Sequence, residues 1–350
     1  MRRYTAILAI AALLLCAFPA LTQATVRVAS WNVLHLGYSN GKNLKALARV
    51  VSQFDLVGLE EVMDSRAVID LQRTLQRQTG QEWSSAVSHE VGRSSYKEAY
   101  AFIWRHSSVS SVGGNTLYKD PGDKFAREPY SAIFRDRESG QEFVLSTVHI
   151  LFGDSRADRT PEINALNEYW GWLNRSYEQP VLLAGDFNTP PGDPAWRALR
   201  SDAVPLITRG ATTLSPIDGQ FVSLYDNIWT APARLNITAA GIMDFPRRLG
   251  VTHQQARDRI SDHAPVFVVL GSPDSKAESI ALARNPQDCI DINKASISEL
   301  DRLPHIGPHY AQLIIAKRPW SNIQALASIR GLSTAYVSDI ASSNLACRDL

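Results

Sequence analysis

Hydrophobic and polar residues follow two different rhythms along the chain, and each rhythm predicts its own kind of element. Positions 26–34 alternate as a half-buried strand does, and 55–62 is a short apolar run ending in acid. Helical spacing predicts helices over 44–54, 64–79 and 161–174. Further extended segments are expected over 99–105, 131–134, 142–148, 221–230 and 264–270. This mixture predicts a four-layer α/β sandwich, in which two mixed sheets pack face to face with helices outside.

A short apolar strand over 181–184 is followed directly by Gly185, Asp186 and Asn188. Gly185 lets the backbone turn without a Cβ penalty. Asp186 and Asn188 are two positions apart, so on an extended segment both side chains point to the same side. A carboxylate and an amide placed in this way can hold a divalent cation and a phosphate oxygen. The same two residues also favour a plain turn, which is the structural alternative.

Other predicted strands also begin or end beside polar side chains. Taken singly, each of these residues is more often structural or solvated than functional. Their recurrence predicts one shared site, because binding sites form where strand ends converge. The residues are Asn32, Glu61, Glu98, His149, Asp226, Asp262 and His263.

Four short motifs appear in the order typical of the endonuclease/exonuclease/phosphatase superfamily: Trp31-Asn32, Glu60-Glu61-Val62, Gly185-Asp186-Phe187-Asn188 and Ser261-Asp262-His263. The chain resembles this superfamily from about position 26 to 270. Ser95-Tyr96-Lys97-Glu98, Arg127-Glu128-Pro129 and Tyr225-Asp226 resemble its deoxyribonuclease I branch more closely. The resemblance implies a deoxyribonuclease I-like domain over 25–271 that hydrolyses DNA by water attack and leaves 5′-phosphate ends.

The resemblance also implies roles for these side chains. Glu61, helped by Asn32 and Asp262, would hold Mg²⁺, with Mn²⁺ as an alternative and Ca²⁺ as a further, structural ion. The catalytic set would be Glu98, His149, Asp186, Asn188, Asp226 and His263. Glu98 would orient His149, and Asp226 would orient His263. Either one imidazole takes the proton of the attacking water and the other serves the leaving oxygen, or both act on phosphoryl charge.

Contacts to DNA follow from the same resemblance. Tyr96 would stack on a sugar or base, and Arg127 would contact a phosphate. Met63 stands where the branch has an arginine that enters the minor groove, so either Arg66 or Arg93 replaces it or duplex contacts are weaker. Glu60 stands where the wider family often has glutamine.

A polar stretch over 272–287 predicts a linker before a smaller unit over 288–350. Helical patterns flank a turn at Gly307 and another at Gly331, which resembles the all-α, paired helix-hairpin-helix domain of competence-type DNA-binding proteins. The resemblance implies that backbone N–H groups at these turns hold a DNA phosphate, with attraction added by Lys317 and Arg318. Each turn keeps only one family glycine, and a helical protein-interaction module remains the alternative.

The chain begins with Met1-Arg2-Arg3, an apolar run over 6–18 and small residues near 24, which predicts a cleaved secretion signal over 1–24. The apolar run is short for a membrane span. We therefore expect a secreted or periplasmic protein whose mature form has no membrane partner. In an oxidising compartment Cys289 and Cys347 favour a disulfide, since two thiols alone make a poor metal site.

The near-neutral charge balance of the chain excludes a strongly basic surface that would bind nucleic acid over its whole extent. Without Arg2 and Arg3, 34 of the 36 lysines and arginines remain against 35 acidic residues, so phosphate binding must come from local placement. The sequence thus predicts a monomeric, largely non-specific DNA endonuclease whose C-terminal unit holds DNA near the site. Two alternatives are a phosphodiesterase or phosphatase of the same fold, acting on phospholipid heads or small phosphates, and a non-catalytic DNA-capture protein.

Overall fold

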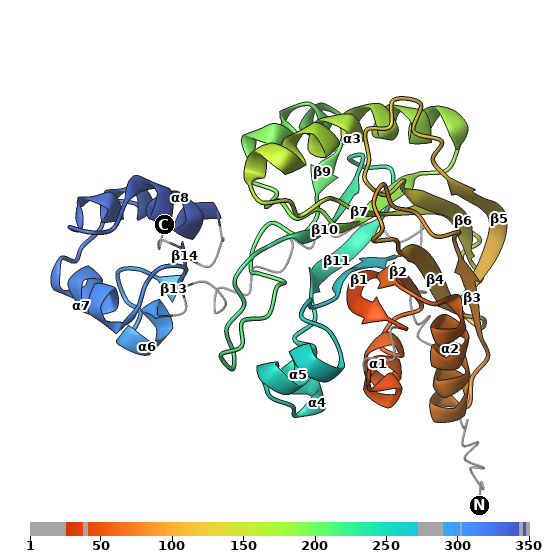
Figure 1. Cartoon of the computed structure of the whole chain (residues 1–350), viewed down its shortest axis with the longest axis horizontal. Coiled ribbons are helices and arrows are strands. Elements are labelled where there is room, and N and C mark those ends of the chain that lie inside the picture. The colour runs from red at the N-terminus through yellow and green to blue at the C-terminus, as the bar shows by residue number, and fades with distance from the viewer. Residues whose placement is uncertain (1–25, 38–40, 272–289, 302, 343–345, 348–350) are drawn as a thin grey trace, which may run out of the picture.

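The computed structural model describes residues 26–37, 41–271, 290–301, 303–342 and 346–347 (Figure 1). The predicted signal, 1–24, and the whole predicted linker, 272–287, lie outside these ranges. So does Cys289, and nothing is described of the Cys347 side chain. The expected disulfide therefore stays a prediction.

The first sheet has six strands in the order β11-β12-β1-β2-β4-β3. Its centre is the parallel pair β1 and β2, and every other pairing is antiparallel. The strands are β1 (Val26–Leu36), β2 (Leu56–Val62), β3 (Trp83–Val87), β4 (Ala99–Arg105), β11 (Ile237–Ile242) and β12 (Val266–Leu270).

The second sheet repeats this plan with the order β5-β6-β7-β8-β10-β9. Its central pair, β7 and β8, is parallel and the rest is antiparallel. The strands are β5 (Val109–Leu117), β6 (Tyr130–Asp136), β7 (Glu142–His149), β8 (Val181–Asp186), β9 (Val204–Pro205) and β10 (Asp226–Thr230).

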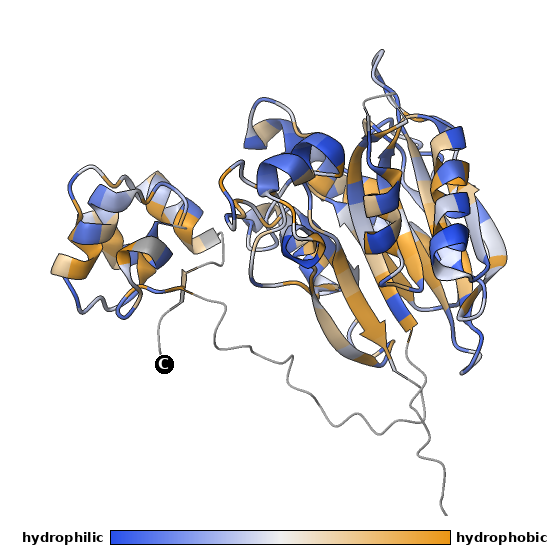
Figure 2. Ribbon diagram, turned by 90° about the horizontal axis from the view of Figure 1, so that it is seen from below, coloured by the Kyte–Doolittle hydropathy of each residue, from blue (hydrophilic) through white to orange (hydrophobic). Residues whose placement is uncertain are grey.

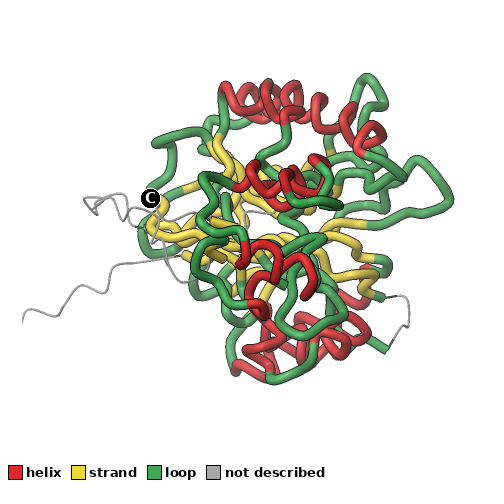
Figure 3. Tube along the Cα trace, turned by 90° about the vertical axis from the view of Figure 1, so that its left-hand side faces the viewer, coloured by secondary structure: helices red, strands yellow, loops and turns green. Residues whose placement is uncertain are grey.

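Helices cover both outer faces, so the predicted four-layer sandwich is confirmed (Figures 1 and 3). On the first sheet these are α1 (Leu44–Val51), α2 (Ser65–Thr79), α4 (Phe245–Leu249) and α5 (His253–Arg259). On the second sheet they are α3 (Arg156–Ser176) and the short 3₁₀ helices η1 (Pro194–Arg197) and η2 (Leu199–Ser201). Aromatic residues such as Phe102 and Phe134 fill the space between the sheets. Figure 2 shows hydrophobic residues gathered on the strands and hydrophilic ones along the helices.

Several element boundaries differ from the prediction. Helix α3 begins at Arg156, five residues before the expected start, because Ser155 and Asp158 form a capping box that holds its first turn. Strand β10 begins only at Asp226. Strands β3, β5 and β11 and helices α4 and α5 were not expected, since they are short or rich in polar and small residues.

The smaller unit has its own apolar core, built around residues such as Ile292, Leu326 and Ile340. Its elements are β13 (Ile290–Asp291), α6 (Ile297–Leu300), α7 (Pro308–Ala316), η3 (Ile323–Ser328), α8 (Thr334–Ser342) and β14 (Ala346–Cys347). The short parallel pairing of β13 with β14 adds to the expected all-α plan. Of the helices in the described ranges, none combines the length and apolar character needed to cross a bilayer.

Candidate active site

The central strands of the two sheets end at one place. In the second sheet Asp186 pairs with His149 on one side and with Asp226 on the other. From the first sheet, the Asn32 amide donates to Glu61 Oε1 at 2.9 Å and to Asp186 Oδ2 at 3.2 Å. Asn32 thus ties the two sheets together at the edge where the strand ends meet.

One buried pair at this edge is His149 with Glu98. His149 Nδ1 lies 2.8 Å from Glu98 Oε1 and 3.1 Å from Oε2, and Glu98 is fully buried. The backbone N–H of His149 donates to the Tyr100 hydroxyl at 3.0 Å. Burial and the nearby Arg127 disfavour the imidazolium, but the Glu98 carboxylate outweighs them and raises the pKa of His149. The predicted orientation of His149 by Glu98 is therefore present.

A second pair faces the first. His263 Nδ1 lies 2.8 Å from Asp226 Oδ2, and the Ser261 hydroxyl accepts from the backbone N–H of His263 at 3.0 Å. Burial opposes the charged ring, but the carboxylates of Asp226 and Asp186 hold the pKa of His263 well above its usual value. Burial also raises the pKa of Asp226. The His263–Asp226 pair therefore releases a proton less readily than the separate groups would in water.

Asp186 lies between the two imidazoles. Its Oδ2 is 3.8 Å from His149 Nε2 and 3.6 Å from His263 Nε2. Burial alone would raise the pKa of Asp186, but the charges of His263 and His149 reverse this and lower it. Asp186 Oδ1 accepts the backbone N–H of Asn188 at 2.9 Å, and the Asn188 amide donates to Ile150 O at 2.8 Å. Both outer nitrogens thus face one shared carboxylate.

The predicted metal residues provide the donor chemistry of a hard cation. Glu61 lies beside Asn32, and its Oε1 is 3.9 Å from His149 Nε2. Asp262 Oδ1 is buried and, within the described ranges, makes no hydrogen bond. Carboxylate oxygens of this kind suit Mg²⁺ or Mn²⁺. The Asn32 amide turns its nitrogen toward Glu61, while its oxygen accepts the backbone N–H of Leu34 at 2.9 Å. The two carboxylates therefore fit the implied cation.

A second group of potential ligands overlaps the catalytic set. One ligand atom each from Asp186, Asp226 and His263 lies within 4.8 Å of the others, and all three residues are buried. The raised pKa of His263 means that its positive charge already balances these carboxylates. This group contains none of the three predicted metal residues, Asn32, Glu61 and Asp262.

His35 and Lys42 also border the site, and neither was predicted from the sequence. His35 Nε2 lies 3.2 Å from Glu61 Oε2. The Lys42 ammonium donates to Ile260 O at 2.8 Å; burial lowers the pKa of Lys42 to about 8, although Asp262 and Glu61 oppose that shift. Both residues follow a predicted strand without a recognisable motif, so their spacing gave no signal.

The predicted DNA-contacting arginines differ in their surroundings. Arg127 is buried; its Nε donates to His149 O at 3.0 Å, while one terminal nitrogen has no partner in the described ranges. That nitrogen has almost no accessible surface, so the predicted phosphate contact requires its surroundings to move. Arg93 instead binds Asp123 and the Phe125 carbonyl, so its guanidinium holds a loop. Arg66 is highly exposed and pairs with Asp64 at 3.0 Å.

Tyr96 lies beside Met63, the residue at the position of the missing arginine. Its hydroxyl is 3.9 Å from Met63 Sδ, and burial raises its pKa far above the ordinary value. Tyr96 therefore acts as a neutral aromatic surface at the rim of the site, which is compatible with stacking.

In the smaller unit, Gly307 caps α7 and Gly331 has a φ of +91°. A Cβ at Gly331 would lie 2.6 Å from the Tyr310 hydroxyl, so this turn needs glycine. Lys317 is exposed, whereas Arg318 donates to the Ile292 carbonyl at 2.8 Å and holds the unit together.

The first turn of this unit carries His305 where the hairpin family has glycine. His305 has a φ of +61°, stacks on Tyr336, and its Nε2 lies 2.8 Å from Asp339 Oδ2. The Asp339 carboxylate thus lies beside the turn that is expected to bind a DNA phosphate. Its negative charge makes this turn a weaker phosphate site than the turn at Gly331.

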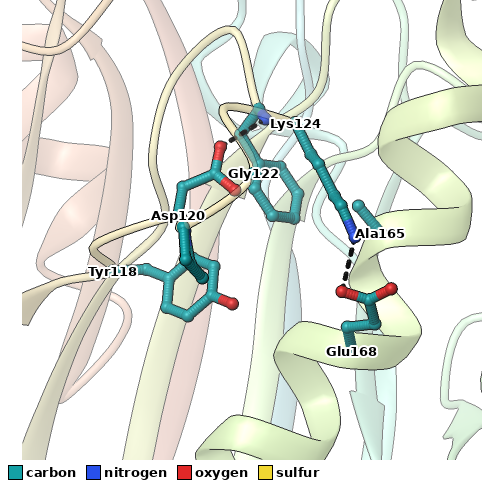
Figure 4. A pocket seen from close by; sticks show the side chains of 8 residues that line it. Tyr118, Asp120, Gly122, Lys124, Ala165 and Glu168 are labelled. Atoms are coloured by element: carbon teal, nitrogen blue, oxygen red, sulfur yellow. Dashed lines mark hydrogen bonds and ion pairs between the residues drawn. The ribbon is translucent and has the colours of Figure 1, made fainter.

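A small pocket of about 190 Å³ lies under the loop before Phe125 (Figure 4). Asp120 accepts the backbone N–H of Phe125 at 2.7 Å, and Lys124 pairs with Glu168 of α3. None of the residues lining the pocket belongs to the candidate site, and these contacts anchor the loop to α3.

Glu60 is fully buried behind the site and accepts hydroxyl hydrogen bonds from Ser30 and Thr147. Burial raises the pKa of Glu60 to about 8, although the two hydroxyls oppose this. At neutral pH the side chain is therefore protonated and resembles the glutamine common in the wider family.

Because the folded-state pKa of Glu60 is raised, its contribution to stability is complete below about pH 4.5 and is lost as pH rises through about 8. Glu60→Gln removes this dependence. We expect the free energy of unfolding of the variant, relative to that of the parent, to rise between pH 5 and 8 by on the order of 1.4 kcal/mol per pH unit, and its melting temperature should rise with it. Exposed Glu82→Gln is the control; a difference that does not change with pH would contradict the assignment.

Comparison with known proteins is consistent with this geometry. The model of the endonuclease/exonuclease/phosphatase family matches residues 29–263. The chain belongs to this family. A helix-hairpin-helix motif matches residues 286–343. Both predicted resemblances are confirmed.

Among curated relatives of this family member, a deoxyribonuclease of Thioalkalivibrio sp. (strain K90mix) is 44% identical over 350 residues and covers 97% of both chains. Human deoxyribonuclease-1 is 31% identical, covering 77% of this chain and 99% of its own. Among solved structures, a mannosyl-6-phosphatase of Bacteroides thetaiotaomicron has a TM-score of 0.52 at 19% identity, covering 70% of this chain and 99% of its own. At that identity the structural likeness shows the fold alone.

Proposed function

We propose that this chain is a metal-dependent, largely sequence-non-specific DNA endonuclease that hydrolyses phosphodiesters by water attack and leaves 5′-phosphate ends. The observation that carries the proposal is the pair of buried imidazoles, each held by its own carboxylate, on either side of Asp186 and next to Glu61. The names of the relatives, deoxyribonuclease and deoxyribonuclease-1, support DNA as the substrate.

The geometry supports a division of labour. Glu61, Asn32 and Asp262 would hold a cation, which supplies positive charge to phosphoryl oxygens when bound. His149 and His263 present Nε2 atoms toward the same space, where one can accept a proton from water and the other can donate to the leaving oxygen. Because the pKa of each imidazole is raised, both can also stabilise phosphoryl charge directly. Arg127 would add a phosphate contact through its buried nitrogen once the surroundings of that nitrogen move.

Plasmid nicking tests this proposal. In Mg²⁺ or Mn²⁺ we expect supercoiled DNA to become nicked and then fragmented, with 5′-phosphate ends, and EDTA should abolish the reaction. Cutting that persists in EDTA, or 3′-phosphate ends, would contradict the proposal.

The proposal includes export to the periplasm or the medium, which the basic start and apolar run over 6–18 support. It also includes a single-chain enzyme, since both histidine–carboxylate pairs come from one chain.

The C-terminal unit is proposed to hold DNA near the site. Removing residues 272–350 should raise KM for long duplex DNA by roughly 10²-fold, because tethering raises the effective substrate concentration. It should leave kcat on short oligonucleotides unchanged, since all candidate catalytic residues precede position 272. Lys317→Glu in the full chain should shift KM in the same direction. An unchanged KM for long DNA would remove this unit from the proposal.

A further inference from the structure

The pairing of β1 with β2 is irregular beside Glu61. Asn32 pairs with Glu60 and Leu36 with Val62, so β1 has two extra residues at this point. Within this bulge Leu34 and His35 have φ angles of +48° and +57°, and Glu61 opposite has +58°. Left-handed backbone costs a residue other than glycine roughly 1–2 kcal/mol. Bulges with such strain re-aim side chains and concentrate at functional sites.

The bulge brings the His35 side chain to Glu61. Both the backbone N–H of His35, at 3.1 Å, and its Nε2, at 3.2 Å, lie against the same oxygen, Glu61 Oε2. The backbone N–H by itself satisfies this oxygen. The other oxygen, Oε1, accepts from the Asn32 amide. Both oxygens of Glu61 therefore already accept a hydrogen bond without the imidazole of His35.

The distance between His35 Nε2 and Glu61 Oε2 also matches a shared ion. Two neighbouring ligands at right angles, each bonded at about 2.1 Å, lie about 3 Å apart. The imidazole ring packs edge-to-face with the Tyr96 ring, with centroids 5.9 Å apart, which restrains its direction. The His35 side chain is 38% exposed, so a cation can reach it from solvent.

We propose that His35 Nε2 joins Glu61 as a ligand of the divalent cation. The inference rests on the proposed function in that it takes the cation to bind at Glu61. A neutral imidazole nitrogen added to carboxylate oxygens makes a mixed site, which favours Mn²⁺ or a later first-row metal over Mg²⁺. His35 would thus set metal preference in addition to holding the ion.

Pulsed electron paramagnetic resonance of the full chain loaded with Mn²⁺ tests this assignment. The parent is expected to show the modulation of a directly bound ¹⁴N nucleus, and labelling the histidines with ¹⁵N should replace it. His35→Gln and His35→Asn should both lose the nitrogen signal while Mn²⁺ remains bound. His106→Gln, at the opposite end of β4 from Glu98, is the matched control and should keep it.

Titration gives a second readout. His35→Gln should weaken Mn²⁺ binding by about tenfold and Mg²⁺ binding by less, so the preference for Mn²⁺ narrows. Bound Mn²⁺ with no nitrogen signal in the parent, or a signal unchanged in His35→Gln, would overturn the role of His35 and leave the metal at Glu61. Absence of any Mn²⁺ or Mg²⁺ binding, or binding insensitive to Glu61→Gln, would overturn this inference and the metal part of the proposed function together.

Discussion

Alanine at His263 or at His149 is expected to reduce kcat for DNA hydrolysis by about 10³-fold without unfolding the protein. Each imidazole presents Nε2 toward Asp186, at 3.6 Å and 3.8 Å, while its Nδ1 is held by a buried carboxylate. Loss of either ring removes a proton-transfer group or a positive charge from the same small space. The double variant should lose little more than a single one, because the two rings act on one reaction. Steady-state rates on plasmid DNA, with a circular dichroism melt of each variant, measure this.

His106→Ala is the matched control for these variants. His106 follows β4 at the end of the strand remote from Glu98, and its ring contacts Arg137. Its rate should equal that of the parent. If His149→Ala or His263→Ala cut DNA as fast as the parent, the assignment of these two histidines to the active site would be wrong.

Gly185→Ala is expected to destabilise the protein by more than about 3 kcal/mol or to prevent folding. Gly185 has a φ of +144°, and a Cβ there would lie 1.9 Å from the Val148 carbonyl oxygen of β7. Relief of that clash must separate β7 from β8, which moves His149 away from Asp186. Any folded fraction should therefore also lose activity. Denaturant melts and rates on plasmid DNA check both effects.

Gly80→Ala separates the clash from the cost of the backbone conformation. Gly80 also has a positive φ, +66°, but a Cβ there would meet nothing within 4 Å. Its cost should be only about 1 kcal/mol. If the two substitutions destabilised the protein equally, close contact between β7 and β8 would not be what requires Gly185.

The sequence predicted the architecture and which strand-end side chains lie together. The strands of the parallel central pairs β1–β2 and β7–β8 are largely buried and rich in apolar residues. Asn32, Glu61, His149 and Asp186 lie at or near the ends of the strands predicted from these patterns. Period and strand-end chemistry are local signals, so they remain visible without coordinates. The partners Glu98 and Asp226 depended on the family resemblance, because each belongs to a strand distant in sequence from its histidine.

What sequence reasoning missed depended on irregular backbone and on tertiary surroundings. The bulge that turns His35 toward Glu61 leaves no trace in the alternation of residue types. Lys42 approaches the site only because of contacts with a distant segment, at Ile260. Arg93 and Arg318 looked like free cations, but each is engaged by backbone carbonyls of its own surroundings. Edge strands such as β5, rich in glycine and serine, lack the apolar pattern of the centre.

The most direct test of the central claim is a substrate panel run with the purified chain in Mg²⁺ and in Mn²⁺. Rates on duplex DNA, RNA, sphingomyelin and a sugar phosphate are compared for the parent and His263→Ala. We expect DNA to be hydrolysed with the highest kcat/KM, EDTA to stop the reaction, and His263→Ala to lose it. Preferred hydrolysis of sphingomyelin or the sugar phosphate, or DNA cleavage unaffected by His263→Ala, would contradict it.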